Sequence, residues 1–210
     1  MTDDSIRPIT LDAGDGAVLA GDLALPPDAP AAAVVCHPHP AYGGDRRNIV
    51  VDTLFRALPA AGVAALRFDF RPGAGDDPAG ARADVVAALD RLATEVGPGV
   101  PLWLAGYSFG ADVALAVDDP RARGWVAVAP PLRFGGPPAP AAGDGRPVLV
   151  VVPEHDQFSP PDAARAATAA WAAVDLVVVP GADHFLAGGT AAVAAAVVAW
   201  LNPEPGGGPR

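Results

Sequence analysis

One serine in the chain stands in a setting that suits a nucleophile. Ser108 is the centre of the pentapeptide Gly-Tyr-Ser-Phe-Gly at 106–110, a G-x-S-x-G pattern. Small residues on either side let the chain turn sharply from a strand into a helix, so that the serine hydroxyl projects clear of the sheet. The apolar run 102–107 predicts that strand, and the stretch 108–117 predicts that helix. The structural alternative is a capping serine in a glycine-flanked turn.

A serine hydroxyl attacks well only when a base removes its proton, and histidine is the side chain best suited to this near neutral pH. Of the four histidines in the chain, His184 follows the last predicted strand, 175–179. Polar residues that follow parallel strands gather at the carboxyl edge of the sheet, where Ser108 is also expected. We therefore predict that His184 is the base.

The base in turn needs a carboxylate that fixes its tautomer and stabilises the imidazolium. Asp156 and Glu154 both follow the valine-rich run 147–152, and Asp183 is adjacent to His184. Adjacent side chains rarely meet in the required geometry, which disfavours Asp183. Glu154 is closer to the end of the strand and remains an alternative. We favour Asp156, because the loop needs a few residues to turn toward the histidine.

Acyl transfer also needs N–H donors that bind the oxyanion of the tetrahedral intermediate. One donor is expected at Phe109, the residue after the nucleophile. The other should come from the loop after the predicted strand 31–37, in which two prolines have no N–H to offer. The N–H groups of His39, Ala41 and Tyr42 are the remaining candidates.

Several nearby residues have other interpretations. His37 and His39 could share a metal ion with Asp45, but no HExxH motif or cysteine pair accompanies them, so no metal or cofactor is expected. A structural role for His37 in its loop is favoured. Cys36 lies in an apolar run and is expected to be a buried core residue. Arg71 is expected in a structural ion-pair cluster, with a substrate carboxylate as its alternative partner.

These residues must be positioned by a sheet. The chain begins with a predicted hairpin, 6–12 and 17–25, and then repeats strand and helix units. This order predicts an α/β fold, a three-layer sandwich in which helices cover both faces of a mostly parallel, eight-stranded sheet. Further strands are expected at 31–37, 63–70, 102–107, 124–129, 147–152 and 175–179, and helices at 47–60, 77–96, 108–117, 161–172 and 190–201.

Length and charge limit the class of protein. The 210 residues suit one α/β domain, expected over 6–201 with flexible tails at 1–5 and 202–210. The formal net charge is −10. A charge of this sign repels nucleic acid and anionic membranes, so neither is expected as a partner.

The sequence also suggests a location. The acidic N-terminal residues lack the basic start and apolar stretch of a signal peptide. The longest apolar run, 191–201, is well short of the roughly 18 residues that a membrane span needs. The single cysteine excludes an intramolecular disulfide. A cytoplasmic monomer or homodimer is expected.

The chain order Ser108, Asp156, His184 is the order of an α/β hydrolase. Over 6–201 the chain resembles that superfamily, and more narrowly the small lidless serine hydrolases known as dienelactone-hydrolase-like or general alpha/beta hydrolases. Dienelactone hydrolases proper have a cysteine nucleophile where this chain has serine. The narrower resemblance rests on Cys-His-Pro-His-Pro at 36–40 with Tyr-Gly-Gly at 42–44, Arg-Phe-Asp-Phe-Arg at 67–71, and Gly-Ala-Asp-His-Phe at 181–185.

The resemblance implies that the backbone of His39 is the second oxyanion donor, with Tyr42 as the runner-up. The interval 130–146 is too short and too rich in proline and glycine to build a helical cap. An open site is therefore expected, with Tyr42, Leu132 and Phe134 lining the substrate pocket.

The expected function is hydrolysis of a carboxylic ester with a short or accessible acyl group, through an acyl-enzyme intermediate. The expected partner is a small-molecule ester. A thioesterase or a peptidase on the same three residues is the alternative within the class. A non-catalytic hydrolase-fold protein that binds a ligand is the alternative outside it.

Overall fold

The structure is a computed structural model that describes residues 6–133, 140–143 and 145–201. Its sheet has the strand order β1-β2-β4-β3-β5-β6-β7-β8 within this described part of the chain. The strands are β1 (Ile6–Asp12), β2 (Val18–Ala24), β3 (Ala32–Cys36), β4 (Ala64–Phe68), β5 (Leu102–Tyr107), β6 (Ala122–Val128), β7 (Val148–His155) and β8 (Val174–Asp183). β1 and β2 form the predicted antiparallel hairpin, β2 pairs antiparallel with β4, and the six strands β3 to β8 run parallel to one another.

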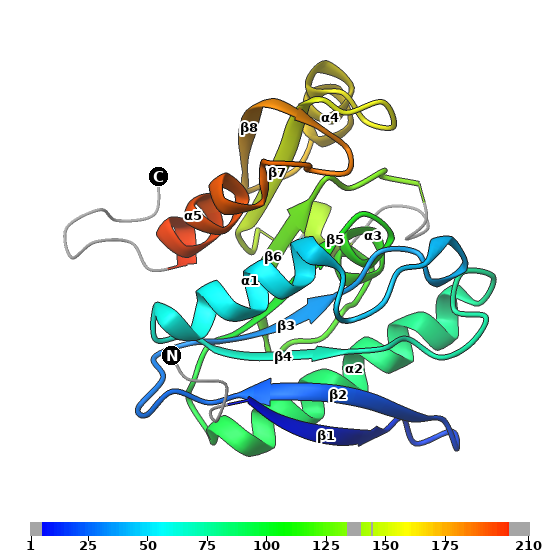
Figure 1. Ribbon diagram of the computed structural model, residues 1–210, viewed down its shortest axis with the longest axis vertical. Coiled ribbons are helices and arrows are strands. Elements are labelled where there is room, and N and C mark those ends of the chain that lie inside the picture. The colour runs from blue at the N-terminus through cyan, green and yellow to red at the C-terminus, as the bar shows by residue number, and fades with distance from the viewer. Residues whose placement is uncertain (1–5, 134–139, 144, 202–210) are drawn as a thin grey trace.

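Helices cover both faces of this sheet (Figure 1). The helices α1 and α5 pack on one face, and α2, α3 and α4 pack on the other. The predicted fold, a mostly parallel eight-stranded sheet in a three-layer α/β-hydrolase arrangement, is therefore confirmed. The α-helices in the described residues are α1 (Ile49–Ala60), α2 (Pro78–Val96), α3 (Phe109–Leu115), α4 (Pro161–Thr168) and α5 (Thr190–Leu201).

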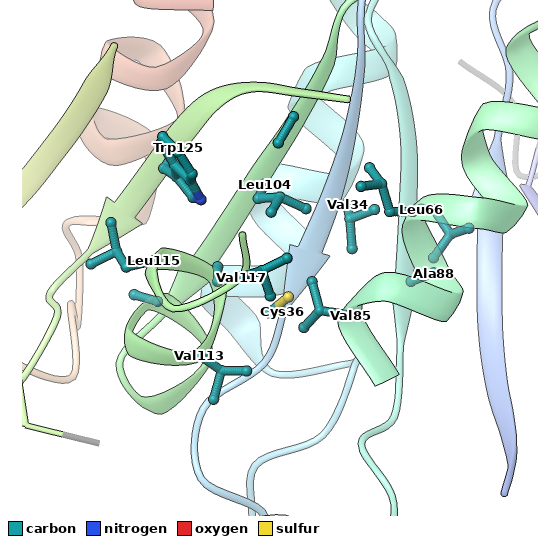
Figure 2. Close-up of a cluster of buried hydrophobic side chains, with 14 of the residues drawn as sticks. Val34, Cys36, Leu66, Val85, Ala88, Leu104, Val113, Leu115, Val117 and Trp125 are labelled. Atoms are coloured by element: carbon teal, nitrogen blue, oxygen red, sulfur yellow. The ribbon is translucent and has the colours of Figure 1, made fainter. Parts of the chain in front are cut away.

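Alternation along the central strands divides the core into two halves. In β3, Val34 and Cys36 face the α2 side, whereas Ala33 and Val35 face the α1 side. The same period of two continues in β5, because successive side chains of a strand point to opposite faces. Figure 2 shows the α2 side, where Cys36 lies among aliphatic side chains and is fully buried. Burial raises the pKa of its thiol, as suits a core residue.

Some element boundaries differ from the sequence-based expectation. β7 and β8 extend to His155 and Asp183, because their pairing continues through a register shift near the carboxyl edge. α4 ends at Thr168 instead of residue 172, since the N–H of Trp171 bonds the carbonyl of Thr168 in a turn that leads into β8. The tails 1–5 and 202–210 lie outside the described residues. No helix among the residues described is both long and apolar enough to cross a bilayer.

A buried ion pair between Arg71 and Asp84 attaches the segment after β4 to the helix α2. Asp84 is fully buried, and its Oδ1 accepts hydrogen bonds from Nε and Nη2 of Arg71 at 2.8 and 2.6 Å. Its Oδ2 accepts the backbone N–H of the same arginine at 2.9 Å. Nη1 of Arg71 donates to Asp15 at 2.7 Å. The guanidinium is thus held by two carboxylates of the protein itself, in a structural ion-pair cluster.

Asp84→Ala is expected to lower the free energy of unfolding by about 3 kcal/mol or more, because it leaves a largely buried guanidinium and a backbone N–H without their acceptor. Urea unfolding measures the change. The matched control is Asp90→Ala on the same helix, whose side chain is 60% exposed in its pair with Arg121. Its cost should stay below about 1 kcal/mol. Equal costs for the two variants would contradict the expectation.

Candidate active site

Ser108 lies at the tight turn between β5 and α3. Its backbone has φ +53° and ψ −121°, a conformation that costs free energy for any residue other than glycine. A Cβ at Gly106 would lie 2.3 Å from the carbonyl oxygen of Gly110, and a Cβ at Gly110 would lie 2.4 Å from that of His37. Both flanking positions therefore require glycine, which is the physical content of the pentapeptide pattern.

The structure brings together the three side chains that the sequence singled out. Ser108 Oγ lies 3.0 Å from His184 Nε2, and His184 Nδ1 lies 2.8 Å from Asp156 Oδ2. His184 and Asp156 are 5% and 2% exposed. They meet because β5, β7 and β8 are parallel, so the residues that follow these strands lie at one edge of the sheet.

The surroundings of Asp156 favour its charged form. Its Oδ1 accepts the N–H groups of Phe158 and Ser159 at 2.8 and 3.0 Å. Burial raises the pKa of this carboxyl, but the hydrogen bonds from His184, Ser159 and Phe158 outweigh burial and lower the pKa below its ordinary value. The carboxylate beside His184 is therefore ionised at neutral pH.

Glu154, the alternative acid, points elsewhere. Its Oε2 accepts the N–H of Gly181 at 2.7 Å, and about half of its side chain is exposed. This bond attaches the loop that carries His184 to the end of β7. The described contacts thus place Asp156, and not Glu154, beside the histidine ring.

Tyr107 and Gln157 also hold His184, and the sequence reasoning missed both. The hydroxyl of Tyr107 donates to the carbonyl of His184 at 2.9 Å, and the N–H of His184 donates to Gln157 Oε1 at 3.4 Å. Burial, followed by the charges of Asp156 and Asp183, raises the pKa of Tyr107 to about 12, so it remains a donor. Their place in the chain could have indicated this role, because Tyr107 precedes Ser108 and Gln157 follows Asp156.

The loop after β3 is stiffened from within. His37 is 1% exposed; its Nε2 accepts the N–H of Phe70 at 3.0 Å, and its Nδ1 lies 2.6 Å from the carbonyl of Pro38. Burial is the main cause that lowers the pKa of His37, which favours the neutral ring. Both ring nitrogens are thus engaged, as a structural histidine requires. The described residues contain no group of three or more His, Cys, Asp or Glu side chains arranged to hold a metal ion.

His39 packs its ring between Tyr42 and Phe109, with centroid distances of 4.8 Å to each. Its Nδ1 accepts the N–H of Ala41 at 3.2 Å, and its carbonyl accepts the N–H of Tyr42 at 3.1 Å. Two of the three candidate oxyanion donors in this loop are therefore committed to bonds within the loop. The aromatic contact places His39 next to Phe109, which carries the other expected donor.

A pocket of about 430 Å³ opens at Ser108. Tyr42 lines it, as predicted, whereas Leu132 packs partly against the core and its neighbours Pro131 and Arg133 line the pocket instead. Phe134 lies outside the described residues. Among the described residues, the pocket is lined by Pro38, His39, Tyr42, Gly43, Gly44, Asn48, Tyr107, Ser108, Pro131, Arg133, Phe158, His184 and Phe185.

Three aromatic side chains form an exposed rim at this pocket, which we call the aromatic rim. Tyr42, Phe158 and Phe185 are 86%, 44% and 60% exposed and all line the pocket. The rings of Phe158 and Phe185 also contact the ring of His184, with centroid distances of 4.5 and 5.8 Å. The sequence reasoning missed these two phenylalanines, although they follow Asp156 and His184 within two residues.

Comparison by sequence gives limited information. No family model matches the chain. A curated relative, an uncharacterised protein of Rickettsia prowazekii (strain Madrid E), is 35% identical over 116 residues, which are 52% of this chain and 48% of the relative. The match thus spans about half the length of that relative.

Solved structures are more informative. An α/β serine hydrolase homologue from Coxiella burnetii superposes with a TM-score of 0.83 at 29% identity, covering 96% of this chain and 99% of that one. An α/β serine hydrolase without a lid from Xanthomonas campestris gives 0.78 at 29% identity, covering 96% and 97%. A dienelactone hydrolase from Anabaena variabilis gives 0.75 at 19% identity, covering 94% and 97%, and supports the fold alone. The predicted resemblance is confirmed: in fold and in sequence, the chain is similar to α/β serine hydrolases, one of which has no lid.

Proposed function

We propose that the protein is a serine hydrolase that cleaves carboxylic esters through an acyl-enzyme intermediate. One observation carries the proposal. Ser108, His184 and Asp156 form a continuous hydrogen-bonded chain whose serine end opens into the pocket. Ser108 is the nucleophile, His184 the base, and Asp156 the carboxylate that orients it.

In the first half-reaction, Ser108 Oγ attacks the ester carbonyl while His184 Nε2 takes the hydroxyl proton. The tetrahedral intermediate then collapses: the bond to the alcohol oxygen breaks, His184 returns the proton to that oxygen, and the alcohol leaves. In the second half, a water attacks the acyl-enzyme with His184 again as base. The ester bond to Ser108 breaks, the carboxylic acid is released, and Ser108 regains its proton.

The oxyanion donors in this mechanism are the N–H groups of Phe109 and His39. Phe109 begins α3 directly after the nucleophile, the position at which one donor is expected. The contact between the His39 and Phe109 rings supports a second donor on the neighbouring loop. The hydrogen bonds that the N–H groups of Ala41 and Tyr42 donate within that loop disfavour these two residues as oxyanion donors. The two prolines around His39 restrict the loop, which preorganises its donor.

The pocket suits esters whose acyl or alcohol part is small or accessible. Its rim is aromatic, and the protein resembles hydrolases without a lid. An ester fits better than an amide because an alkoxide is the better leaving group. Short esters that dissolve in water should therefore be turned over in preference to emulsified long-chain triglycerides.

Two measurements on the wild-type protein test the proposal. A fluorophosphonate probe should label Ser108, and peptide mapping can locate the label because the chain has only two other serines, Ser5 and Ser159. A p-nitrophenyl ester series from acetate to palmitate should give its highest kcat/KM among the short acyl chains. Absence of labelling together with absence of turnover would overturn the proposal, and a preference for emulsified long chains would overturn its substrate class.

A further inference from the structure

One formally charged side chain stands out among the described residues that line the pocket. Among the described residues that line it, Arg133 is the only one that is an arginine, lysine, aspartate or glutamate. The rest are apolar, aromatic or uncharged polar residues. The whole chain carries a net charge of −10, so a cation at this place is the opposite of the surrounding bias. The local charge favours an anionic group on whatever occupies the pocket.

The backbone of Arg133 is tied to the helix that begins after the nucleophile. Asp112 of α3 is 3% exposed, and its two carboxylate oxygens accept the N–H groups of Leu132 and Arg133 at 2.9 and 2.8 Å. Leu132 has φ +58°, a left-handed conformation that is unfavourable for leucine. The two hydrogen bonds to the buried carboxylate of Asp112 offset this strain. They keep the backbone of Arg133 at a defined place relative to Ser108.

The guanidinium lies close to the reacting groups. Its central carbon is 5.5 Å from the ring centroid of Phe158, and that ring is 4.5 Å from the ring centroid of His184. The two distances limit the separation of the Arg133 guanidinium from the His184 ring to about 10 Å. Ser108 Oγ lies 3.0 Å from His184 Nε2. A short aliphatic chain can therefore join an ester carbonyl at Ser108 to a carboxylate at the Arg133 guanidinium.

We propose that the preferred esters carry a carboxylate that pairs with Arg133 while the ester carbonyl lies at Ser108. The inference rests on the proposed ester hydrolysis and names its substrate class: half-esters of short dicarboxylic acids, or acyl esters of short hydroxy acids. The planar guanidinium can donate two parallel hydrogen bonds to a carboxylate. The aromatic rim receives the uncharged part of the substrate.

The test compares anionic and neutral esters of similar size. Monoethyl glutarate carries a carboxylate on its acyl part, and ethyl hexanoate is its neutral counterpart. The butanoate ester of 3-hydroxypropanoate carries a carboxylate on its alcohol part, and propyl butanoate is its neutral counterpart. Acid release at constant pH gives kcat/KM for each ester in wild type, Arg133→Gln and Arg123→Gln. Arg123, the matched control, is an exposed residue near the amino end of β6, whereas Arg133 lies beyond its carboxyl end.

Arg133→Gln is expected to lower kcat/KM for the anionic ester about tenfold, mainly through KM, and to leave the neutral ester within about twofold. Arg123→Gln should change neither. Added salt should reduce the preference of the wild type for the anionic ester, because it screens an exposed charge pair. The pair of esters that shows the effect tells whether the carboxylate belongs to the acyl or to the alcohol part.

Equal losses on anionic and neutral esters would overturn the inference, because Arg133 would then act only on the structure of the loop. Unchanged kinetics of Arg133→Gln on every ester would overturn it as well. Both outcomes leave the proposed hydrolysis intact. If the wild type hydrolyses none of the esters, the proposed function fails. Calorimetric binding of the product glutarate to wild type and to Arg133→Gln then decides whether Arg133 recognises a carboxylate.

Discussion

Ser108→Ala is expected to lower kcat for ester hydrolysis by a factor of about 10⁴ to 10⁶. The variant keeps the pocket and the expected oxyanion donors but has no oxygen that can form the acyl-enzyme. Hydrolysis must then proceed by direct attack of water on the ester. Turnover of p-nitrophenyl butyrate at saturating substrate measures the loss, and fluorophosphonate labelling should disappear with it.

The control for this experiment is Thr94→Ala, which also replaces a hydroxyl residue by alanine. Thr94 lies on the exposed face of α2, and its hydroxyl donates to the carbonyl of Asp90 at 2.9 Å. Its kcat should equal that of the wild type. Both variants should unfold near the wild-type urea concentration, so that a loss of activity reports chemistry and not misfolding. Retention of more than about a tenth of the wild-type kcat by Ser108→Ala would contradict nucleophilic catalysis by Ser108.

The sequence predicted the fold and the convergence of Ser108, Asp156 and His184 for a physical reason. Apolar runs and helical periodicity determined the order of the elements, and parallel strands bring their carboxyl ends to one edge whatever their exact length. β7 and β8 are longer than expected, yet the residues that follow them still meet at that edge. The need for glycine at 106 and 110 could also be predicted from the sequence pattern, because any Cβ there would overlap backbone atoms.

Apart from Tyr42, most of the pocket wall could not be predicted, because it depends on how loops direct their side chains. Leu132 was expected in the pocket on the strength of its apolar side chain. Its left-handed backbone and the bonds to Asp112 leave Leu132 packed partly against the core, while Arg133 lines the pocket. Phe158 belongs to the same class of residue: it is placed by a loop whose N–H groups bond Asp156. Composition and periodicity carry no information about such a loop.

The choice between Asp156 and Glu154 leads to the second large effect. Asp156→Asn is expected to lower kcat/KM by about 10⁴-fold. The carboxamide can donate a hydrogen bond to Nδ1 of His184, which then keeps its proton on Nε2. In that tautomer the ring cannot accept the proton of Ser108, although every side chain is still in place. Because the pKa of Asp156 is lowered, the wild-type side chain is a carboxylate near neutral pH and can only accept the hydrogen bond from Nδ1 of His184.

Glu154→Gln is the matched variant, because it neutralises the neighbouring carboxylate with the same change of atoms. The glutamine can still accept the N–H of Gly181 through its amide oxygen, so the loop that carries His184 should keep its position. Its kcat/KM should stay within about threefold of the wild type, since an exposed carboxylate contributes little to the orientation of the ring. A loss of the order of 10⁴-fold in Glu154→Gln, with Asp156→Asn nearly unaffected, would transfer the acid role to Glu154. Equal and moderate losses in both would mean that the two carboxylates act on His184 only through the position of its loop, and that neither fixes the tautomer.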